Sequence, residues 1–200
     1  MAVISNGTTL IDNGALDAGV PTGSLILLST QTASASATIS FTSGIDSTYD
    51  SYVFKFYNIH PATNDVEFQF NFSIDSGSNY NVTKTTTAFE SYNYENDSAR
   101  DLAYLASDDL AQSTAFQNLS RRTGNDNDQS ASGFLSIYNP SSTTFVKHFI
   151  SKVHSSHQLD IAYTMYVAGY GNTTSAVNAV RFQFDSGNID SGTIKMYGVK

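Results

Sequence analysis

The stretch Val66-Glu67-Phe68-Gln69-Phe70-Asn71-Phe72 decides the fold, because apolar and polar residues alternate through it without a break. Successive side chains of a β-strand point to opposite faces of the sheet. The valine and the three phenylalanines therefore share one face, and Glu67 is expected to face outward with Gln69. This pattern predicts a strand with one buried and one solvated face. Residues 75–79, Asp-Ser-Gly-Ser-Asn, are typical of the turn that would follow it.

The same alternation recurs along the chain from residue 25 onward. It predicts further strands at 39–41, 53–59, 85–89, 133–138, 144–153, 160–167, 180–184 and 193–197. Turn signals lie between them at 139–140, 154–157, 169–171 and 185–187. Strands in this number, with no helices alternating between them, predict an all-β fold, an antiparallel jelly-roll-like sandwich. The expected organisation is an extended N-terminal arm over residues 1–24 and one sandwich domain over 25–200.

Composition supports the all-β prediction. The 200 residues include 13 Phe and 12 Tyr, while charged residues make up 14%, about half the usual share. Aromatic residues favour strands, whereas helices favour Ala, Leu, Glu and Lys.

Residues 90–128 are predicted to form one long connection between strands. Within it, Leu102, Leu105, Leu110 and Phe116 are interspersed with alanines, a spacing that predicts a short helical stretch. Long loops inside compact domains are commonly functional or flexible.

The aromatic, amide and acidic side chains of this connection are the expected contacts for a sugar or receptor. Sugars stack on aromatic rings, while amides and carboxylates bind their hydroxyl groups. The alternative is that these are ordinary half-buried tyrosines and a polar loop tip. The candidate contact residues are Tyr92, Tyr94, Asn96, Tyr104, Asp126 and Asp128.

The charge of the chain excludes several classes of function. A net charge of −8, with Arg121-Arg122 as the one cationic pair, argues against binding to nucleic acid or to an anionic membrane. The chain has no cysteine, so it can form neither disulfides nor thiolate metal sites. No apolar run is long enough to cross a bilayer, and the first residues do not resemble a secretory signal.

The sequence offers weak indications of a metal site. His154 and His157 have a spacing that zinc uses on a helix, but their serine-rich context favours a solvated hairpin loop. Residues 124–128, Gly-Asn-Asp-Asn-Asp, resemble a calcium loop without its internal glycine and terminal glutamate. We expect a polar loop tip there, with a weak cation site near residues 125–128 as the alternative.

Catalytic motifs are also lacking. There is no nucleophile elbow, zinc-protease motif or phosphate-binding loop. Glu67, Glu90 and Glu95 could pair in space as glycosidase carboxylates do, but nothing in the sequence brings two of them together. The expectation is a non-enzymatic protein with no cofactor and no metal.

The first 24 residues are predicted to act in assembly. Turn dipeptides occur at 6–7 and 13–14, and the apolar residues between them cannot form a core alone. The arm is therefore expected to pair with its own domain or with a neighbouring subunit, a frayed terminus being the alternative. The residues expected to anchor it are Val3, Ile4, Leu10 and Ile11.

The chain as a whole resembles virion structural proteins of marine bacteriophages that infect picocyanobacteria and Pelagibacter-like bacteria. The resemblance is carried by the opening stretch 4–16, by Tyr57-Asn-Ile-His-Pro-Ala62, by Thr173-Thr-Ser-Ala176 and by the closing stretch 186–198, Ser-Gly-Asn-Ile-Asp-Ser-Gly-Thr-Ile-Lys-Met-Tyr-Gly. These motifs are strands and turns, so the similarity specifies no site.

The resemblance implies a capsid- or tail-associated β-sandwich without catalytic activity, made in the infected bacterial cytoplasm and carried on the virion. Such proteins serve as tail-fibre tips or receptor-binding knobs, often as homotrimers. The expected function is host-surface recognition as a tail-fibre or knob component. Capsid decoration is the first alternative, and a glycan-degrading virion enzyme a remote one. The implied partners are copies of itself, other virion proteins and a host-surface glycan.

Overall fold

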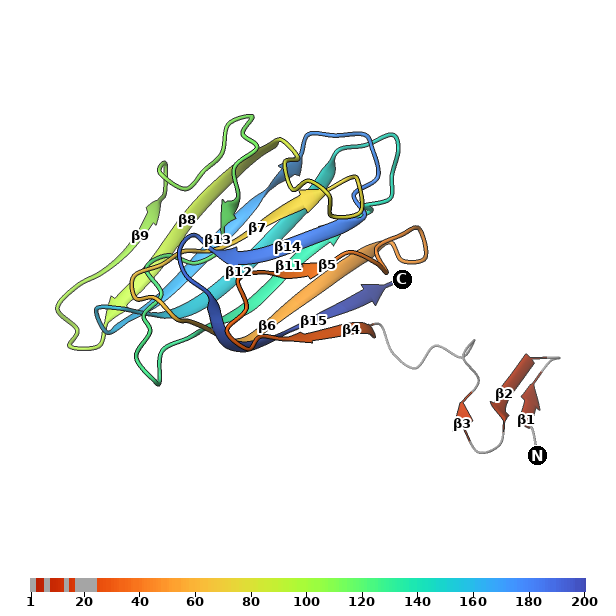
Figure 1. The fold of residues 1–200 in the computed structure, drawn as a ribbon, viewed down its shortest axis with the longest axis horizontal. Helices are drawn as coiled ribbons and strands as arrows, with labels where there is room; N and C mark the ends of the chain where they lie inside the picture. The colour runs from red at the N-terminus through yellow and green to blue at the C-terminus, as the bar shows by residue number, and fades with distance from the viewer. Residues whose placement is uncertain (1–2, 6–7, 13–14, 17–24) are drawn as a thin grey trace.

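The computed structural model describes residues 3–5, 8–12, 15–16 and 25–200. Within these residues there are strands and turns but no helix, and the strands form three antiparallel sheets (Figure 1). Two of the sheets face each other as the layers of a β-sandwich. The all-β prediction is therefore confirmed.

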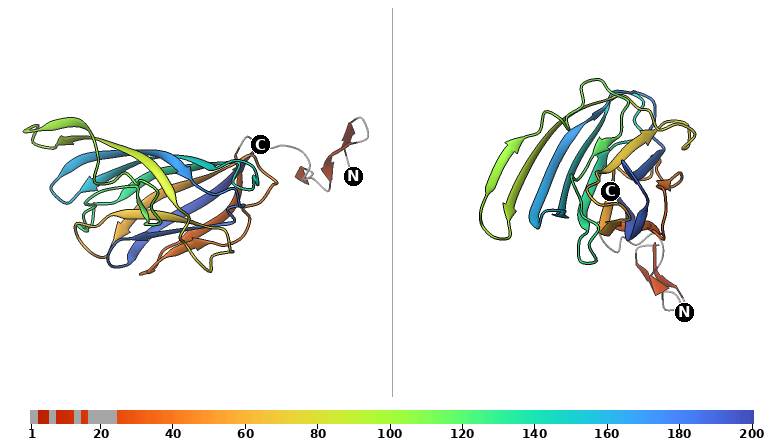
Figure 2. Two further views of the ribbon diagram at one scale, coloured as in Figure 1. Left: turned by 90° about the horizontal axis from the view of Figure 1, so that it is seen from above. Right: turned by 60° about the vertical axis from the view of Figure 1, so that its left-hand side comes forward.

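The larger sandwich sheet has eight strands in the order β4-β15-β6-β11-β12-β13-β8-β9. Its strands are β4 (Ile26–Thr32), β6 (Ser51–Pro61), β8 (Lys84–Tyr94), β9 (Arg100–Tyr104), β11 (Ala131–Tyr138), β12 (Lys147–His157), β13 (Ile161–Gly171) and β15 (Ile189–Val199). Figure 2 shows these strands side by side, with β9 at one edge of the sheet.

The smaller sandwich sheet has four strands in the order β10-β7-β14-β5. They are β5 (Ile39–Phe41), β7 (Phe68–Ser73), β10 (Gln117–Asn118) and β14 (Ala179–Phe184). The right-hand view of Figure 2 shows this sheet on one side of the larger one. We call the side of the larger sheet that it covers the inner face, and the opposite side the outer face.

The core lies between the sheets and consists largely of phenylalanine rings. The three phenylalanines of β7 are fully buried, as the alternation predicts. Phe68 packs edge-to-face on Phe56 of the larger sheet at a centroid distance of 5.2 Å, and Phe70 packs in the same way on Phe149 at 5.0 Å. Edge-to-face packing of this kind stabilises a core beyond the area it buries. The small sheet is thereby fixed over β6 and β12.

Two finer predictions are wrong. A jelly roll is built from two sheets of similar size, whereas here the sheets have eight and four strands. The helical stretch predicted within 90–128 is absent from the described residues: Leu102 lies in β9, and residues 105–116 form turns and short bridges. Ser107, Asp108 and Asp109 explain this, because such side chains compete for backbone hydrogen bonds and disfavour a helix interior.

Two predicted turns are strand residues instead. Residues 154–157 end β12 and residues 169–171 end β13, and these strands pair with each other over eleven positions. The chain reverses at 158–160, where Asp160 has a φ of 56°. Aspartate tolerates this left-handed conformation, which explains why the turn forms there. The serines and glycines that indicated turns are accommodated because each strand is paired on both sides.

The N-terminal strands β1 (Val3–Ser5), β2 (Thr8–Asp12) and β3 (Ala15–Leu16) form the third sheet by pairing with one another. Val3 and Ile4 are exposed and Ile11 is half-buried, while the side chain of Leu10 lies outside the described part of the chain. The anchoring role of these residues stays a prediction.

Among the residues that are described, there is no helix that is long and apolar enough to span a membrane.

Candidate functional site

The strongest candidate site lies on the inner face of the larger sheet, near the ends of β8 and β13. Residues 117–123 cross this face and link the two sheets. Gln117 accepts a hydrogen bond from Thr86 of β8 at 2.7 Å, and Thr123 bridges both Val66, next to the small sheet, and His157 of β12. A gap is left beyond this crossing segment.

That gap is a pocket of about 200 Å³, which we call the tyrosine pocket. Its volume is below the roughly 300–1,000 Å³ of sites for drug-sized ligands, so it suits a single ring or the end of a longer chain. The lining residues are Glu90, Tyr92, Tyr94, Arg121, Arg122, His157, Leu159, Ile161 and Tyr163.

Strand register brings the tyrosines together. Tyr92 of β8 is paired directly with Tyr163 of β13, and Tyr94 is paired with Ile161. Because side chains alternate along a strand, all four lie on the inner face. The rings of Tyr92 and Tyr94 meet edge-to-face at a centroid distance of 6.0 Å, and the ring of Tyr163 lies 5.9 Å from that of His157.

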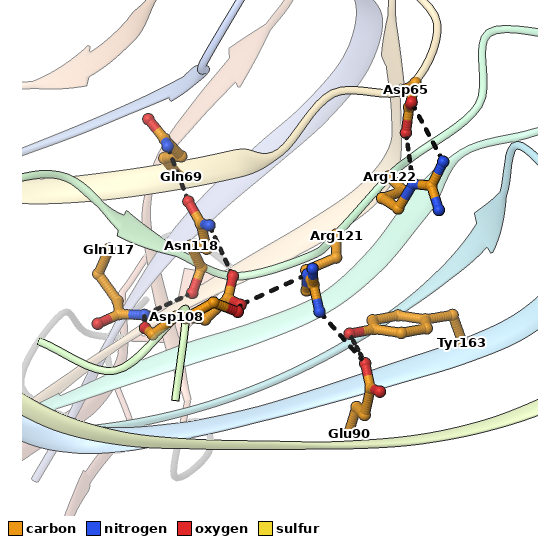
Figure 3. A network of polar contacts seen from close by, with 10 residues as sticks. Asp65, Gln69, Glu90, Asp108, Gln117, Asn118, Arg121, Arg122 and Tyr163 are labelled. Carbon is orange, nitrogen blue, oxygen red and sulfur yellow. Dashed lines mark hydrogen bonds and ion pairs between the residues drawn. The ribbon is translucent and has the colours of Figure 1, made fainter. Parts of the chain in front are cut away.

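A network of charged groups forms the polar wall of the pocket (Figure 3). Tyr163 donates a short hydrogen bond from its hydroxyl to Glu90. Arg121 lies between two carboxylates: its Nη1 is 3.8 Å from Glu90 Oε2, and its Nε is 3.4 Å from Asp108 Oδ2. The side chain of Asp108 is only 3% exposed, so Arg121 offsets the charge of a buried carboxylate.

The network continues away from the pocket toward the small sheet (Figure 3). Asn118 donates to Asp108 Oδ1 at 2.7 Å and accepts from Gln69 of β7, also at 2.7 Å. Gln117 donates to the backbone carbonyl of Asp108 at 2.9 Å. These bonds hold Asp108, and through it Arg121, in one position. The pocket wall is therefore preorganised by residues on both sheets.

The protonation states of the pocket follow from burial. Burial, with the hydrogen bond to Glu90 second, raises the pKa of Tyr163 far above its usual value, so its hydroxyl stays protonated and donating. Burial, followed by the charge of Arg122, lowers the pKa of His157 to about 4. His157 is therefore neutral at pH 7, and its Nδ1 accepts a hydrogen bond from the backbone N–H of Leu159 at 3.1 Å.

Glu67 lies behind this wall rather than facing solvent as predicted. Its Oε2 is buried and has no hydrogen-bond partner among the described residues. Burial, together with the nearby charge of Asp108, raises its pKa to about 7. The expectation that Glu67 would face outward is wrong, because its carboxyl is largely buried and lies near the charges of Asp108 and Arg121. Glu67 is not among the residues that line the pocket.

The charge balance of the pocket favours a neutral, hydroxyl-bearing ligand. Arg121 is held between two carboxylates, and Arg122 forms a two-pronged ion pair with Asp65 at 2.8 and 3.3 Å. The positive charge of each guanidinium is therefore already offset by a carboxylate, which leaves little attraction for a phosphate or carboxylate ligand. Glu90 is the one carboxylate in the lining, whereas glycoside hydrolysis requires two that flank the bond. The arrangement suits binding better than hydrolysis.

The structure brings together two of the six residues predicted to contact a ligand. Tyr92 and Tyr94 line the pocket, but Tyr104 lies on the outer face, where its hydroxyl donates to Asp109 at 2.6 Å. Asn96 belongs to the turn between β8 and β9, where its side chain accepts from the backbone N–H of Ser98. Asp128, with Asp126 near it in the same turn, contributes to two polar hollows outside the pocket.

The metal alternatives gain no support from the geometry. His154 and His157 are three residues apart on a strand, so they project from opposite faces of the sheet and cannot bind one ion. His154 instead lies 3.0 Å from the hydroxyl of Thr164 on the outer face. Within the described ranges, no group of three or more histidine or acidic side chains is arranged to hold a metal ion.

Sequence reasoning missed the residues that make the pocket polar. Glu90 and Tyr163 are 73 positions apart, and Glu90 and Arg121 are 31 apart. The one available signal was the Arg121-Arg122 pair, because two adjacent cations in an acidic chain need carboxylate partners.

Comparison with protein-family models, with curated proteins and with solved structures finds no match to this chain.

Proposed function

We propose that this protein is a non-enzymatic component of a virion surface and that its tyrosine pocket binds the terminal residue of a neutral host-surface glycan. One observation carries the proposal of glycan binding. Tyr92, Tyr94 and Tyr163 converge on a pocket whose polar wall, Glu90 and Arg121, is already neutralised and held in place.

The chemistry of the pocket matches that of a sugar ring. The apolar face of a pyranose packs on aromatic rings, while its hydroxyls need both donors and acceptors. Glu90 supplies acceptor oxygens, Arg121 supplies donors, and Tyr163 is kept protonated. A volume of about 200 Å³ favours recognition at a chain end over binding along a polymer.

The virion location is proposed from the resemblance to marine phage structural proteins, and the all-β sandwich is compatible with it. In this proposal, the protein assembles with copies of itself and with other virion proteins and acts at the tail as a fibre or knob component. A head-decoration protein of the same fold would need no ligand pocket. Sugar binding therefore favours the recognition role.

The pocket is tested by saturation-transfer NMR of the purified chain with a panel of single sugars. The panel contains glucose, galactose, mannose and N-acetylglucosamine, with glucuronate and inorganic phosphate as anionic probes. At least one neutral sugar should receive saturation from the protein, and the anionic probes should not. Tyr92→Ala should abolish the signal by removing a ring face. Glu90→Gln should weaken it by removing the charged acceptor.

Tyr104→Ala is the matched control, because Tyr104 is an exposed tyrosine on the opposite face of the same sheet. It should leave the sugar signal unchanged. Saturation of no neutral sugar, or a signal that survives both Tyr92→Ala and Glu90→Gln, would contradict the proposed binding.

The role in recognition is tested separately on host cells. The purified protein should bind cells of the host and compete with adsorption of the phage that encodes it, and Tyr92→Ala should lose this competition. Stoichiometric binding to empty phage heads without affinity for cells would establish the decoration alternative instead. Release of reducing sugar from host polysaccharide would overturn the non-enzymatic proposal.

A further inference from the structure

The outer face of the larger sheet combines exposed apolar side chains with unpaired positive charge. Of the 13 large apolar side chains exposed in the described residues, seven lie on strands of this sheet and face away from the small sheet. These are Leu27, Tyr57, Phe89, Leu102, Tyr104, Tyr138 and Ile150. Concentrations of exposed apolar surface of this kind mark interaction sites.

One continuous row of side chains crosses the middle of this face. Strand register pairs each member with the next, from β9 across to β15. We call this set the central row: Tyr104, Phe89, Tyr166, Lys152, Phe134, Lys55 and Lys195. The row therefore contains four aromatic rings and three ammonium groups across seven strands, with the lysines toward β15.

Two aromatic rings of the row stack on each other. Phe89 and Tyr166 stack with an interplanar angle of 6° and a centroid distance of 4.7 Å. The ammonium group of Lys152 lies 5.3 Å from the centroid of Tyr166. Tyr166 is thus in contact with both of its neighbours in the row, Phe89 and Lys152.

The charge of the face is opposite to that of the whole protein. Lys55, Lys152 and Lys195 lie in the middle of it, whereas its carboxylates lie at its borders: Asp190 near the start of β15, and Asp109, which accepts the hydroxyl hydrogen bond of Tyr104. Among the described residues, no carboxylate is within ion-pair distance of these three lysines. The chain carries −8, so subtracting the three positive charges leaves −11 for the rest of the molecule. A second copy therefore supplies a strongly acidic surface.

That acidic surface is concentrated at one end of the sandwich. Glu95, Asp128 and Asp160 line one hollow there, and Asp128 and Asp190 line the next. All four are exposed, and neither hollow contains a lysine or an arginine. We call these four residues the acidic end. Its charge is complementary to that of the outer face.

The area of the outer face is sufficient for a stable contact. Eight strands about 4.8 Å apart, whose outward residues extend over about 27 Å on average, give roughly 900 Å². Specific protein interfaces bury about 800 Å² per partner. The face also contains an apolar hollow of about 540 Å³ between Tyr138, Ile150 and Tyr170, which could receive a side chain of the partner.

We propose that the outer face is the surface through which the protein binds the acidic end of a second copy of itself. The acidic end borders the outer face, since outward residues such as His154 and Ser191 also line its hollows. The contact therefore closes a two-fold dimer where it is reciprocated, and builds a ring or a chain of subunits where it is not. This inference deepens the self-association part of the proposed function and is independent of what the tyrosine pocket binds.

The experiment measures the mass of the purified full chain by sedimentation equilibrium across the micromolar range, at low and high salt. The wild type should associate, and salt should weaken the association because exposed charges are screened. Lys152→Glu should raise the dissociation constant on the order of tenfold or more, since it places like charges in contact. Ile150→Glu should have a similar effect by placing a charge beside the apolar hollow.

Matched controls make the same chemical changes elsewhere. Lys200→Glu reverses an exposed lysine at the C-terminus, and Ile74→Glu alters an isoleucine of the β7–β8 turn that is 42% exposed, compared with 48% for Ile150. Both should associate like the wild type. Circular dichroism and the melting temperature should show that all four variants are folded.

Three results would overturn the proposal. The first is a wild type that stays monomeric across the range, and the second is association that Lys152→Glu and Ile150→Glu leave unchanged. The third is normal association of the double variant Glu95→Lys/Asp128→Lys, which would exclude the acidic end as the complementary surface. Tyr92→Ala should associate normally even if it no longer binds sugar, so failure of this proposal can be distinguished from failure of the pocket.

Discussion

Replacing Glu67 by glutamine should stabilise the protein, and the gain should grow as the pH rises. The carboxylate is buried beside Asp108, and its Oε2 has no hydrogen-bond partner among the described residues. Folding therefore disfavours its charged form. Glu67→Gln keeps the size and shape of the side chain and removes the charge.

The magnitude follows from the pKa of Glu67, which burial raises from 4.5 to about 7. At roughly 1.4 kcal/mol for each pKa unit, this corresponds to about 3 kcal/mol of stability. Between pH 4.5 and pH 7 the folded state holds a proton that the unfolded state has lost. The contribution is thus fully present below pH 4.5, declines as the pH rises, and is lost above pH 7. Glutamine does not titrate, so the variant avoids this loss.

The assay is urea unfolding of the wild type and Glu67→Gln at pH 5, 6, 7 and 8. Every other titrating group is shared, so the difference between the two unfolding free energies isolates Glu67. It should increase by about 2.5 kcal/mol from pH 5 to pH 8, because the unfolded chain has already lost most of this proton at pH 5. Glu95→Gln makes the same change at an exposed glutamate, and as the matched control it should alter the unfolding free energy by less than about 0.5 kcal/mol. A difference that stays constant or shrinks with rising pH would refute the reasoning.

Three further predictions concern the scaffold. Phe182→Ala should lower the free energy of unfolding in urea by about 4 kcal/mol, because this buried ring packs on four others. Phe145→Ala, at a side chain that is 67% exposed, should change it by less than about 0.5 kcal/mol. Gly133→Ala should lower stability by about 1–3 kcal/mol, since its Cβ would lie 2.2 Å from the backbone carbonyl oxygen of Lys152 and a β-ladder cannot move aside easily; calorimetry showing an unchanged melting temperature would contradict this. Lys84→Met should flatten the dependence of stability on pH. Burial lowers the pKa of Lys84 to about 7, so between pH 7 and pH 10 the unfolded chain holds a proton on Lys84 that the folded chain has lost. The free energy of unfolding of the wild type should therefore rise with pH over this range. Equal slopes of unfolding free energy against pH for the two proteins would contradict this.

The sequence predicts the core strands well because their apolar side chains alternate, although the polar face of β7 is also largely buried, with Asn71 and Ser73 inaccessible to solvent. In β7, three phenylalanines meet the other sheet while polar residues alternate with them, so local pattern and tertiary environment agree. The prediction fails where pairing overrides local preference. Residues 154–157 contain turn-forming serines, yet they stay in β12 because neighbours on both sides satisfy their backbone groups.

The candidate site was less predictable because its members come together only through the sheet. Tyr92 and Tyr94 could be proposed as ligand contacts from a local cluster of aromatic and amide residues. Tyr163 could not, because its place opposite Tyr92 depends on the register between β8 and β13. Tyr104 was grouped with the other tyrosines by its position in the sequence, but it is paired with Phe89 and so faces the other way. A shift of one residue along a strand changes the face completely.

The unequal sizes of the two sheets account for both candidate surfaces. Four strands cannot cover eight, so the inner face of β8 and β13 extends beyond the small sheet. An irregular segment has to cover it, and irregular segments bring polar backbone and side-chain groups that must be satisfied. Asp108 and Arg121 both lie in the mostly irregular stretch between β9 and β11, which is why a polar wall and a pocket occur beside an aromatic core. The outer face has no second layer among the described residues. Its exposed rings and lysines therefore make it the surface that a partner is most needed to cover.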